Sequence, residues 1–194
     1  LWKASSYYSY TGKALNKEKE ETDDLSKSAA ALTTKGTNSL FNEVVTTTKD
    51  AETGVQTTTR GYDMDAITNA VKNFVSDYNT AMKAGSESSS TNVRRNTQYM
   101  VRQTAIYEKS LAQAGVTIGK DNTLSLDTDK LKSANIDTLK RIFNGNTSYA
   151  ALTSSRSQSI GQAAVREAST GTTYGRTGVY NMFQNPMSAW NWYL

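Results

Sequence analysis

The fold of this chain is decided by the stretch VRRNTQYMVRQTAIYEKSLAQAGVTIGKDNTLSLDTDKL, residues 93–131. Its first half carries apolar or small side chains at spacings that alternate between four and three residues. These positions are Val93, Thr97, Met100, Thr104, Tyr107, Leu111 and Ala114. Because this heptad pattern is typical of a helix with one buried face, we predict a helix over residues 93–114. Gly115 then ends the helix, since glycine enters the left-handed region without steric cost.

Residues 116–126 predict a β-hairpin. Apolar and polar side chains alternate on both sides of the turn-forming run at 119–122. Leu124 and Leu126 share one face, which we expect to pack on the helices, with Ser125 facing outward. Asp127 follows as the N-cap of a further short helix, because its carboxylate accepts hydrogen bonds from unpaired backbone N–H groups. Asp137 is expected to cap the next short helix in the same way.

The helix over 93–114 is one of three long helices that the pattern predicts. An amphipathic stripe predicts the first, which begins near Asp63 or Asp65 and ends near Gly85. The Ser-rich run at 86–91 is short enough to turn the chain back, so the helix over 93–114 is expected to lie antiparallel to the first. A third long helix is predicted from Tyr149 to about Ala168, with small side chains that permit close packing.

These elements divide the sequence into three regions. Residues 1–62 form an N-terminal segment with short helices near 25–32 and 40–45 and a Thr-rich linker, in which 55–60 is an edge strand or an extended connection. Residues 63–168 form a helical stalk domain with a β-hairpin near 116–126, and residues 169–194 form a tail rich in glycine and aromatic side chains. The predicted fold class is mainly α: an antiparallel helical bundle or coiled-coil hairpin with one small β-hairpin.

Composition excludes several classes of function. The chain has neither cysteine nor histidine, so it lacks the side chains of Ser-His-Asp and Cys-His catalysis and of zinc sites built on His or Cys. No catalytic, cofactor-binding or metal-binding residue is predicted, and we expect no enzyme. The net charge of +4 is spread along the chain, which argues against nucleic-acid binding, and no apolar run is long enough to span a membrane.

Apolar surface for assembly is predicted in two places. The near-neutral aromatic tail either packs on the bundle or anchors a neighbouring subunit, because such a segment is a binding surface if it stays exposed. The heptad face of residues 93–114 is the other candidate. The candidate interface residues are Met100, Thr104, Tyr107, Leu111, Tyr180, Phe183, Trp190 and Trp192.

Four short motifs resemble a known family when they are taken in order. They are FVSDYN at 74–79, LAQAGV at 111–116, DNTLSLDTDKL at 121–131 and IFNG at 142–145. This ordered set resembles the C-terminal helical stalk of bacterial flagellar filament-cap proteins, the hook-associated protein 2 family. The resemblance covers a little under half of the chain.

The resemblance implies a secreted structural protein that self-assembles on a filament of the bacterial flagellum or cell surface, without catalysis. Its partners would be further copies of itself or flagellin-like filament subunits. The chain departs from the family at its end, where Gly171, Gly175 and Gly178 are expected to break the long final helix and an aromatic tail replaces it. The alternative is a helical binding or adhesion module at the cell surface, whose aromatic tail docks on a partner.

Overall fold

The structure is a computed structural model that describes residues 2–173, with the side chains of residues 12–169. Its elements are α1 (Trp2–Thr33), η1 (Gly36–Asn38), β1 (Glu43–Lys49), β2 (Gln56–Tyr62), α2 (Met64–Glu87), α3 (Thr91–Ile106), α4 (Glu108–Gln113), β3 (Val116–Ile118), β4 (Leu124–Leu126), α5 (Thr128–Ser133), α6 (Ile136–Leu139), η2 (Lys140–Asn144) and α7 (Tyr149–Thr173). The fold is mainly helical with a small β-hairpin, which confirms the predicted fold class. The described residues hold a second two-stranded sheet, β1–β2, besides the predicted hairpin β3–β4.

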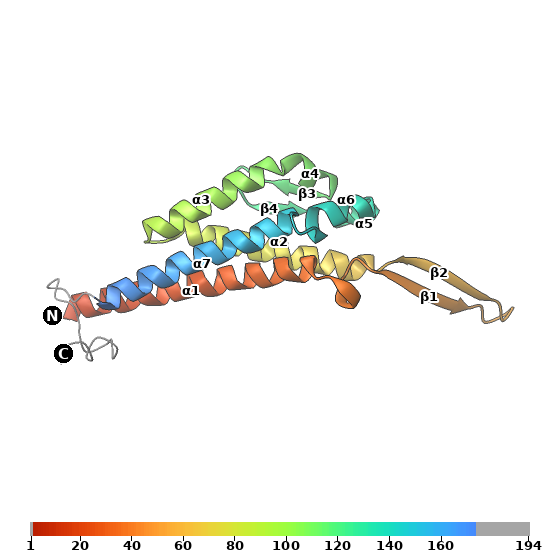
Figure 1. The fold of residues 1–194 in the computed structure, drawn as a ribbon, viewed down its shortest axis with the longest axis horizontal. Helices are drawn as coiled ribbons and strands as arrows, with labels where there is room; N and C mark the ends of the chain where they lie inside the picture. The colour runs from red at the N-terminus through yellow and green to blue at the C-terminus, as the bar shows by residue number, and fades with distance from the viewer. Residues whose placement is uncertain (1, 174–194) are drawn as a thin grey trace, which may run out of the picture.

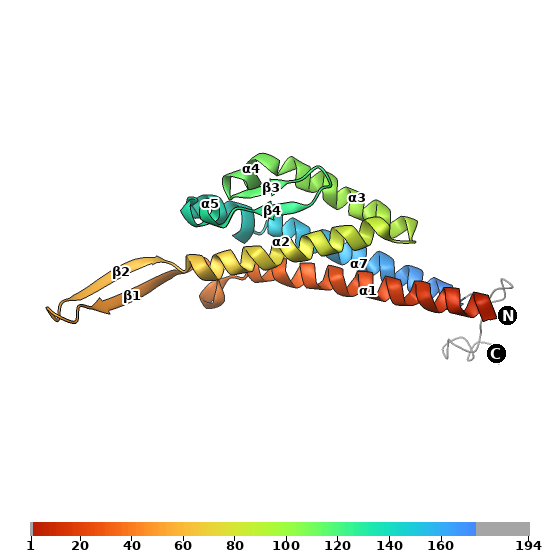
Figure 2. The same cartoon turned by 180° about the vertical axis from the view of Figure 1, so that it is seen from behind.

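The molecule is elongated, and α1 and α7 form its axis (Figures 1 and 2). The two helices run antiparallel and pack side by side, while α2 packs on α1 and α3 packs on α7. Helix α1 begins and helix α7 ends at the same end of this axis. The β1–β2 hairpin projects from the opposite end, so the two ends of the molecule present different structures.

A single long helix, α1, replaces the short helix predicted near residues 25–32. The charged run at 17–24 continues the helix because its charges pair one turn apart, as in Lys17 with Glu21 and Lys19 with Asp23. The buried face of α1 also has heptad spacing, with two polar members that hide it in the sequence. These buried positions are Leu15, Glu18, Thr22, Leu25, Ala29 and Leu32.

Small side chains let α1 and α7 approach closely. Gly161 of α7 faces Thr22 of α1, and a Cβ atom at position 161 would lie 2.8 Å from the Thr22 Oγ1. The Ser157 hydroxyl donates a hydrogen bond to the carbonyl of the same Thr22. Helix α7 continues to Thr173, through Gly171, so the predicted break at Gly171 is wrong.

Helices α2 and α3 form the predicted antiparallel pair, with some corrections at the ends. The Asp63 carboxylate caps α2 by accepting from the Ala66 amide at 2.8 Å, and Ser90 caps α3. Helix α2 ends at Glu87, two residues beyond Gly85, near which its end was predicted. Gly85 itself lies where α3 comes so close that a Cβ there would be 2.1 Å from Oγ1 of Thr97.

The predicted helix over 93–114 is divided into α3 and α4 at Tyr107. Tyr107 leaves helical geometry, with φ −90° and ψ 3°, and its amide bonds to the Thr104 carbonyl one residue short of the α-helical partner. The heptad face is nevertheless directed inward as predicted, because its other members are all buried and Tyr107 is partly buried.

The hairpin over 116–126 is confirmed as β3–β4, with Val116 paired to Leu126 and Ile118 paired to Leu124. Leu124 is buried and Ser125 is exposed, as expected. The Asn79 side-chain amide holds β4 against α2 by donating to the Leu124 carbonyl at 2.8 Å and accepting from the Leu124 amide at 2.7 Å. The motif at 74–79 therefore joins a helix face to the hairpin.

Asp127 caps α5, as predicted, by accepting from the amides of Asp129 and Lys130. The prediction that Asp137 caps the next helix is wrong. Asn135 caps α6 instead, because its side chain accepts from the Asp137 and Thr138 amides. Such caps satisfy backbone donors that a short helix leaves unpaired.

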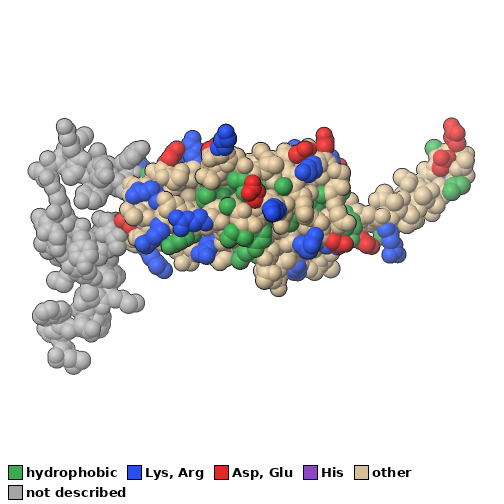
Figure 3. All heavy atoms as spheres, turned by 90° about the horizontal axis from the view of Figure 1, so that it is seen from above, with side chains coloured by type: hydrophobic (Ala, Val, Ile, Leu, Met, Phe, Trp, Pro, Cys, Tyr) green, Lys and Arg blue, Asp and Glu red, His purple; other side chains and the backbone are tan. Residues whose placement is uncertain are grey.

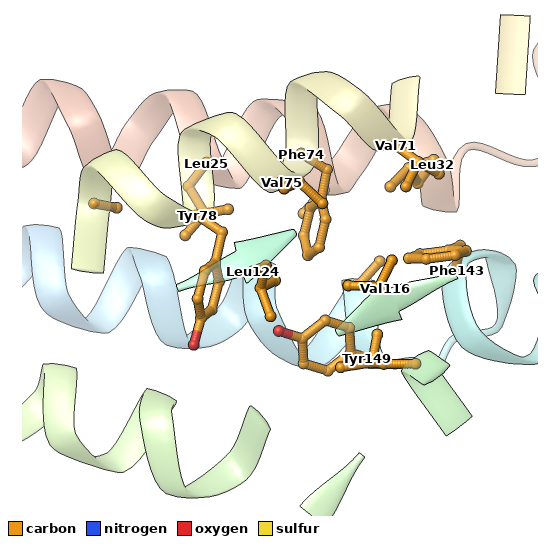
Figure 4. Packing of buried hydrophobic residues seen from close by; sticks show 14 of the residues in the cluster. Leu25, Leu32, Val71, Phe74, Val75, Tyr78, Val116, Leu124, Phe143 and Tyr149 are labelled. Carbon is orange, nitrogen blue, oxygen red and sulfur yellow. The ribbon is translucent and has the colours of Figure 1, made fainter. Parts of the chain in front are cut away.

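One hydrophobic core joins α1, α2, α7, η2 and the hairpin β3–β4 (Figure 4). Phe74 of α2 lies at its centre, with edge-to-face contacts to Phe143 and Tyr149 at centroid distances of 6.2 and 5.8 Å. Leu25 and Leu32 of α1 point into the same cluster. The N-terminal helix is thus part of the same packed core as the predicted stalk domain.

The prediction of a short helix near residues 40–45 is wrong, because the apolar residues of that cluster belong to two different parts of the structure. Phe41 is buried in the core, while Val44 and Val45 belong to strand β1. The β-branched run that follows favours a strand over a helix, since these side chains lose little freedom in an extended chain. Of the two interpretations of residues 55–60, the strand is confirmed.

Candidate functional site: the β1–β2 arm

The structure places half of the sequence-predicted interface residues inside the fold. Met100, Thr104 and Leu111 are buried, and the partly buried Tyr107 packs against Tyr149 at a centroid distance of 5.3 Å, with the rings tilted by 44°. These four side chains face the protein's own core in this structure and are not on an accessible interface. The tail residues Tyr180, Phe183, Trp190 and Trp192 lie outside the described residues.

A buried polar network explains why a threonine is accommodated in the heptad face. The Tyr78 hydroxyl donates to Oγ1 of Thr104 at 3.0 Å, and the Tyr149 hydroxyl lies 3.0 Å from the same oxygen. Burial raises the pKa of Tyr78 to about 12 and also raises the pKa of Tyr149. Both phenols therefore stay neutral at physiological pH, and the network links α2, α3 and α7 as a structural element.

A second polar cluster lies where the α2–α3 turn meets α1 and α7. The Ser88 hydroxyl donates to Oε2 of Glu18 at 2.8 Å, and the Ser90 hydroxyl donates to Oε2 of Glu167 at 3.3 Å. Burial raises the pKa of Glu18, and the nearby Glu21 charge adds to this, while the Ser88 hydrogen bond opposes it. This cluster ties the turn to the helical axis.

A groove of about 650 Å³ lies between α2, α3 and the β3–β4 turn, lined by charges of both signs that include Lys83, Glu87, Arg102 and Asp121. Among the described residues, no group of three or more acidic side chains is placed to hold a metal ion. In the same part of the chain, no helix is long and apolar enough to cross a membrane.

The hairpin β1–β2, which we call the arm, differs from the rest of the molecule in its exposure. Every residue of β1 is exposed, and in β2 only Gly61 and Tyr62 at the base are partly covered. Figure 3 shows the arm projecting from the body, uncharged along most of its length, with charged side chains near its base and tip. The arm therefore has no core of its own.

The arm is held in register at both ends. At its base, the Tyr62 hydroxyl donates to Glu43, and the Lys140 ammonium lies 4.7 Å from the centroid of the Tyr62 ring. At its tip, the Asp50 carboxylate accepts hydrogen bonds from the Glu52 and Thr53 amides and the Thr53 hydroxyl, and these bonds lower the pKa of Asp50. Gly54 completes the turn with φ +67°.

Strand β1 presents an open edge to solvent. Hydrogen-bonded and non-hydrogen-bonded pairs alternate along an antiparallel ladder. Because the Asp50 amide bonds to the Val55 carbonyl, the alternation directs the backbone groups of residues 43, 45, 47 and 49 away from β2. Val44 and Val45 on this strand are 42% and 60% exposed, which adds apolar surface beside unpaired backbone groups.

Comparisons with known proteins returned no match to a family model, to a curated protein or to a solved structure. The candidate site therefore rests on geometry alone. Sequence reasoning missed the arm because the signal of a half-buried strand, alternation of apolar and polar residues, is absent from a hairpin with both faces in solvent. The run of Val and Thr at 44–48 was the available signal.

Proposed function

We propose that this chain is a structural protein that self-assembles, and that it has no catalytic role. The observation that carries the proposal is the arm, a long two-stranded hairpin that contacts the core at its base, through Tyr62, and is otherwise exposed. A two-stranded hairpin is marginally stable by itself in water. An exposed strand edge of seven residues is also a template for pairing with another chain. The arm is therefore suited to be covered in an assembly.

The shape of the molecule supports the same proposal. The arm and the paired ends of α1 and α7 lie at opposite ends of a long axis (Figure 1). A subunit with different structures at its two ends can contact one neighbour through the arm and another through the helical end. This arrangement suits a subunit of an extended assembly better than it suits a protein with one concave ligand site.

The setting that we propose is the bacterial cell surface or flagellum, in filament assembly or capping. The ordered motifs at 74–79, 111–116, 121–131 and 142–145 support it, because they resemble the stalk of filament-cap proteins. The partners would be further copies of the chain or flagellin-like subunits. The alternative is a binding or adhesion module that acts as a monomer and docks through its aromatic tail.

Sedimentation velocity over a series of protein concentrations tests the proposal. The full chain is expected to associate reversibly, so that its mean mass rises with concentration. A variant truncated after Thr173, which keeps α7 complete, separates the two sources of association. If the truncated chain still associates, the described part of the protein is sufficient. If both chains stay monomeric at the highest concentration, self-assembly is wrong and the tail-docking alternative is favoured.

A further inference from the structure

We infer that the partner of the arm is the arm of a second copy of this chain, paired antiparallel through β1. This inference rests on the proposed self-assembly and identifies the surface and the register. In the resulting four-stranded sheet the strand order is β2, β1, the partner's β1 and the partner's β2. The two copies are related by a two-fold axis, so each contributes the same surface.

The open edge of β1 restricts which residues of the two strands can lie opposite each other. Residues 43, 45, 47 and 49 direct their backbone groups outward, so a partner strand must oppose them with its own outward-facing residues. A two-fold axis centred on Thr46 meets this requirement. It places Val45 opposite the partner's Thr47, and Thr46 opposite the partner's Thr46. All seven residues of β1 are then paired.

The charged residues of β1 favour this register, and they favour β1 over β2 as the strand that pairs. With the axis at Thr46, Glu43 of one copy lies opposite Lys49 of the other, and the same pair forms again at the second end of the sheet. Opposite charges directly across a sheet are favourable and like charges are not. These are the terminal residues of β1, and the strand between them is uncharged, so no other charge opposes the pairing.

Strand β2 lacks this self-complementarity. It carries one charged side chain, Arg60, and no acid, so an antiparallel β2–β2 pair has no opposite charge to place beside it. Gly61 also weakens a strand, because it has no side chain to pack across the edge. The edge of β1 is therefore the one suited to self-pairing.

The pairing predicts an extended dimer. Because β1 is antiparallel to its partner, the base of each arm meets the tip of the other, and the two helical bodies lie at opposite ends of the shared sheet. The helical end of each body, where α1 begins and α7 ends, lies opposite the arm (Figure 2). In the proposed dimer this end therefore points away from the partner. Those ends stay free for other contacts in an assembly.

Because the chain has no native cysteine, a single introduced cysteine tests the proposed pairing directly in the full chain. In the proposed register, Thr46 of each copy forms a non-hydrogen-bonded pair, whose Cα atoms are about 4.5 Å apart. This distance is within the range of a disulfide. The Thr46→Cys variant should therefore form a covalent dimer under mild oxidation, and the yield should rise with protein concentration.

Thr59→Cys is the matched control. Thr59 lies directly opposite Thr46 within one arm, at the same height and in the same type of exposed site. In the proposed sheet the two Thr59 positions are separated by three strand spacings, about 14 Å, which is too far for a disulfide. We expect several-fold more covalent dimer from Thr46→Cys. Equal yields from the two variants would mean random collision and would overturn the inference.

A charge exchange tests the register independently. The Glu43→Lys chain carries two basic residues at the ends of β1, and the Lys49→Glu chain carries two acidic ones. Each should associate less than the wild type, because like charges face each other. An equimolar mixture restores two opposite pairs and should form a heterodimer, seen by sedimentation.

The outcomes separate this inference from the proposed function. If the wild type associates while the cysteine and mixing experiments fail, the chain self-assembles through another surface, and the inference is wrong. If every variant and the wild type stay monomeric, both proposals are wrong.

Discussion

At the scale of single residues, Thr104 shows what the sequence predicts and what it leaves out. Its heptad position predicts burial, and a buried hydroxyl requires a hydrogen-bond partner. The structure supplies two, the hydroxyls of Tyr78 and Tyr149. Those partners come from helices that are distant in sequence, so no local pattern identifies them.

The Thr104→Val variant tests this network. Valine keeps the shape of the side chain but leaves both tyrosine hydroxyls without their shared partner, so the free energy of unfolding should fall by about 1–3 kcal/mol. Urea denaturation measures the change. Thr80→Val, at an exposed site on α2, is the control and should stay within about 0.5 kcal/mol of the wild type. Equal effects of the two substitutions would contradict a buried network.

The same network predicts a loss of stability in alkali. Burial raises the pKa of Tyr78 from 10.0 to about 12 in the folded state. Between these values the unfolded chain releases the proton while the folded chain keeps it, so the free energy of unfolding falls as pH rises from 10 towards 12. Urea midpoints across this range should fall less steeply for Tyr78→Phe than for the wild type. Parallel pH profiles would contradict the assignment.

At the scale of elements, sequence patterns were sufficient to predict the helices and strands that pack on elements close to them in the sequence. The hairpin over 116–126, its Asp127 cap and the antiparallel pair α2–α3 all follow from patterns within a few residues of each element. Helix α1 does not, because Glu18 and Thr22 interrupt its apolar face and become buried only against other helices.

The arm was missed because it is exposed, whereas the buried face of α1 was missed because it contains polar residues. Both of its faces lie in solvent, so the run at 44–48 has no need to alternate apolar and polar side chains. The turn at 50–55 also lacks a two-residue hairpin signal such as Asn-Gly. The sequence therefore left an edge strand and an extended connection open for residues 55–60, and its apolar cluster at 40–45 indicated a short helix where β1 begins.

The contact between α1 and α7 makes a prediction about small side chains. Gly161→Val adds bulk where even a Cβ atom would lie 2.8 Å from Oγ1 of Thr22, so overpacking should cost about 1–3 kcal/mol. Thermal melts measure the loss. Gln162→Val is the matched control, because its side chain is exposed on the same helix. A melting temperature as high for Gly161→Val as for Gln162→Val would contradict close packing of the two helices.

At the scale of the whole molecule, the residues that stabilise the fold and the surface proposed for assembly belong to different parts of the structure. The core joins α1, α2, α7 and the hairpin β3–β4, and it contains the heptad face that the sequence indicated as a possible interface. Apart from Tyr62 at its base, the arm lies outside that core. A change on the arm should therefore alter association and leave the folding of the body intact.

Amide hydrogen exchange of residues 43–62, recorded at low and at high protein concentration, tests this account most directly. In dilute solution the arm amides should exchange quickly, because the hairpin has no core to protect it. As the chain associates, protection should rise in β1, while protection of the body should stay constant. If the chain associates and the arm amides exchange equally fast at both concentrations, the arm is not the assembly surface and the account is wrong.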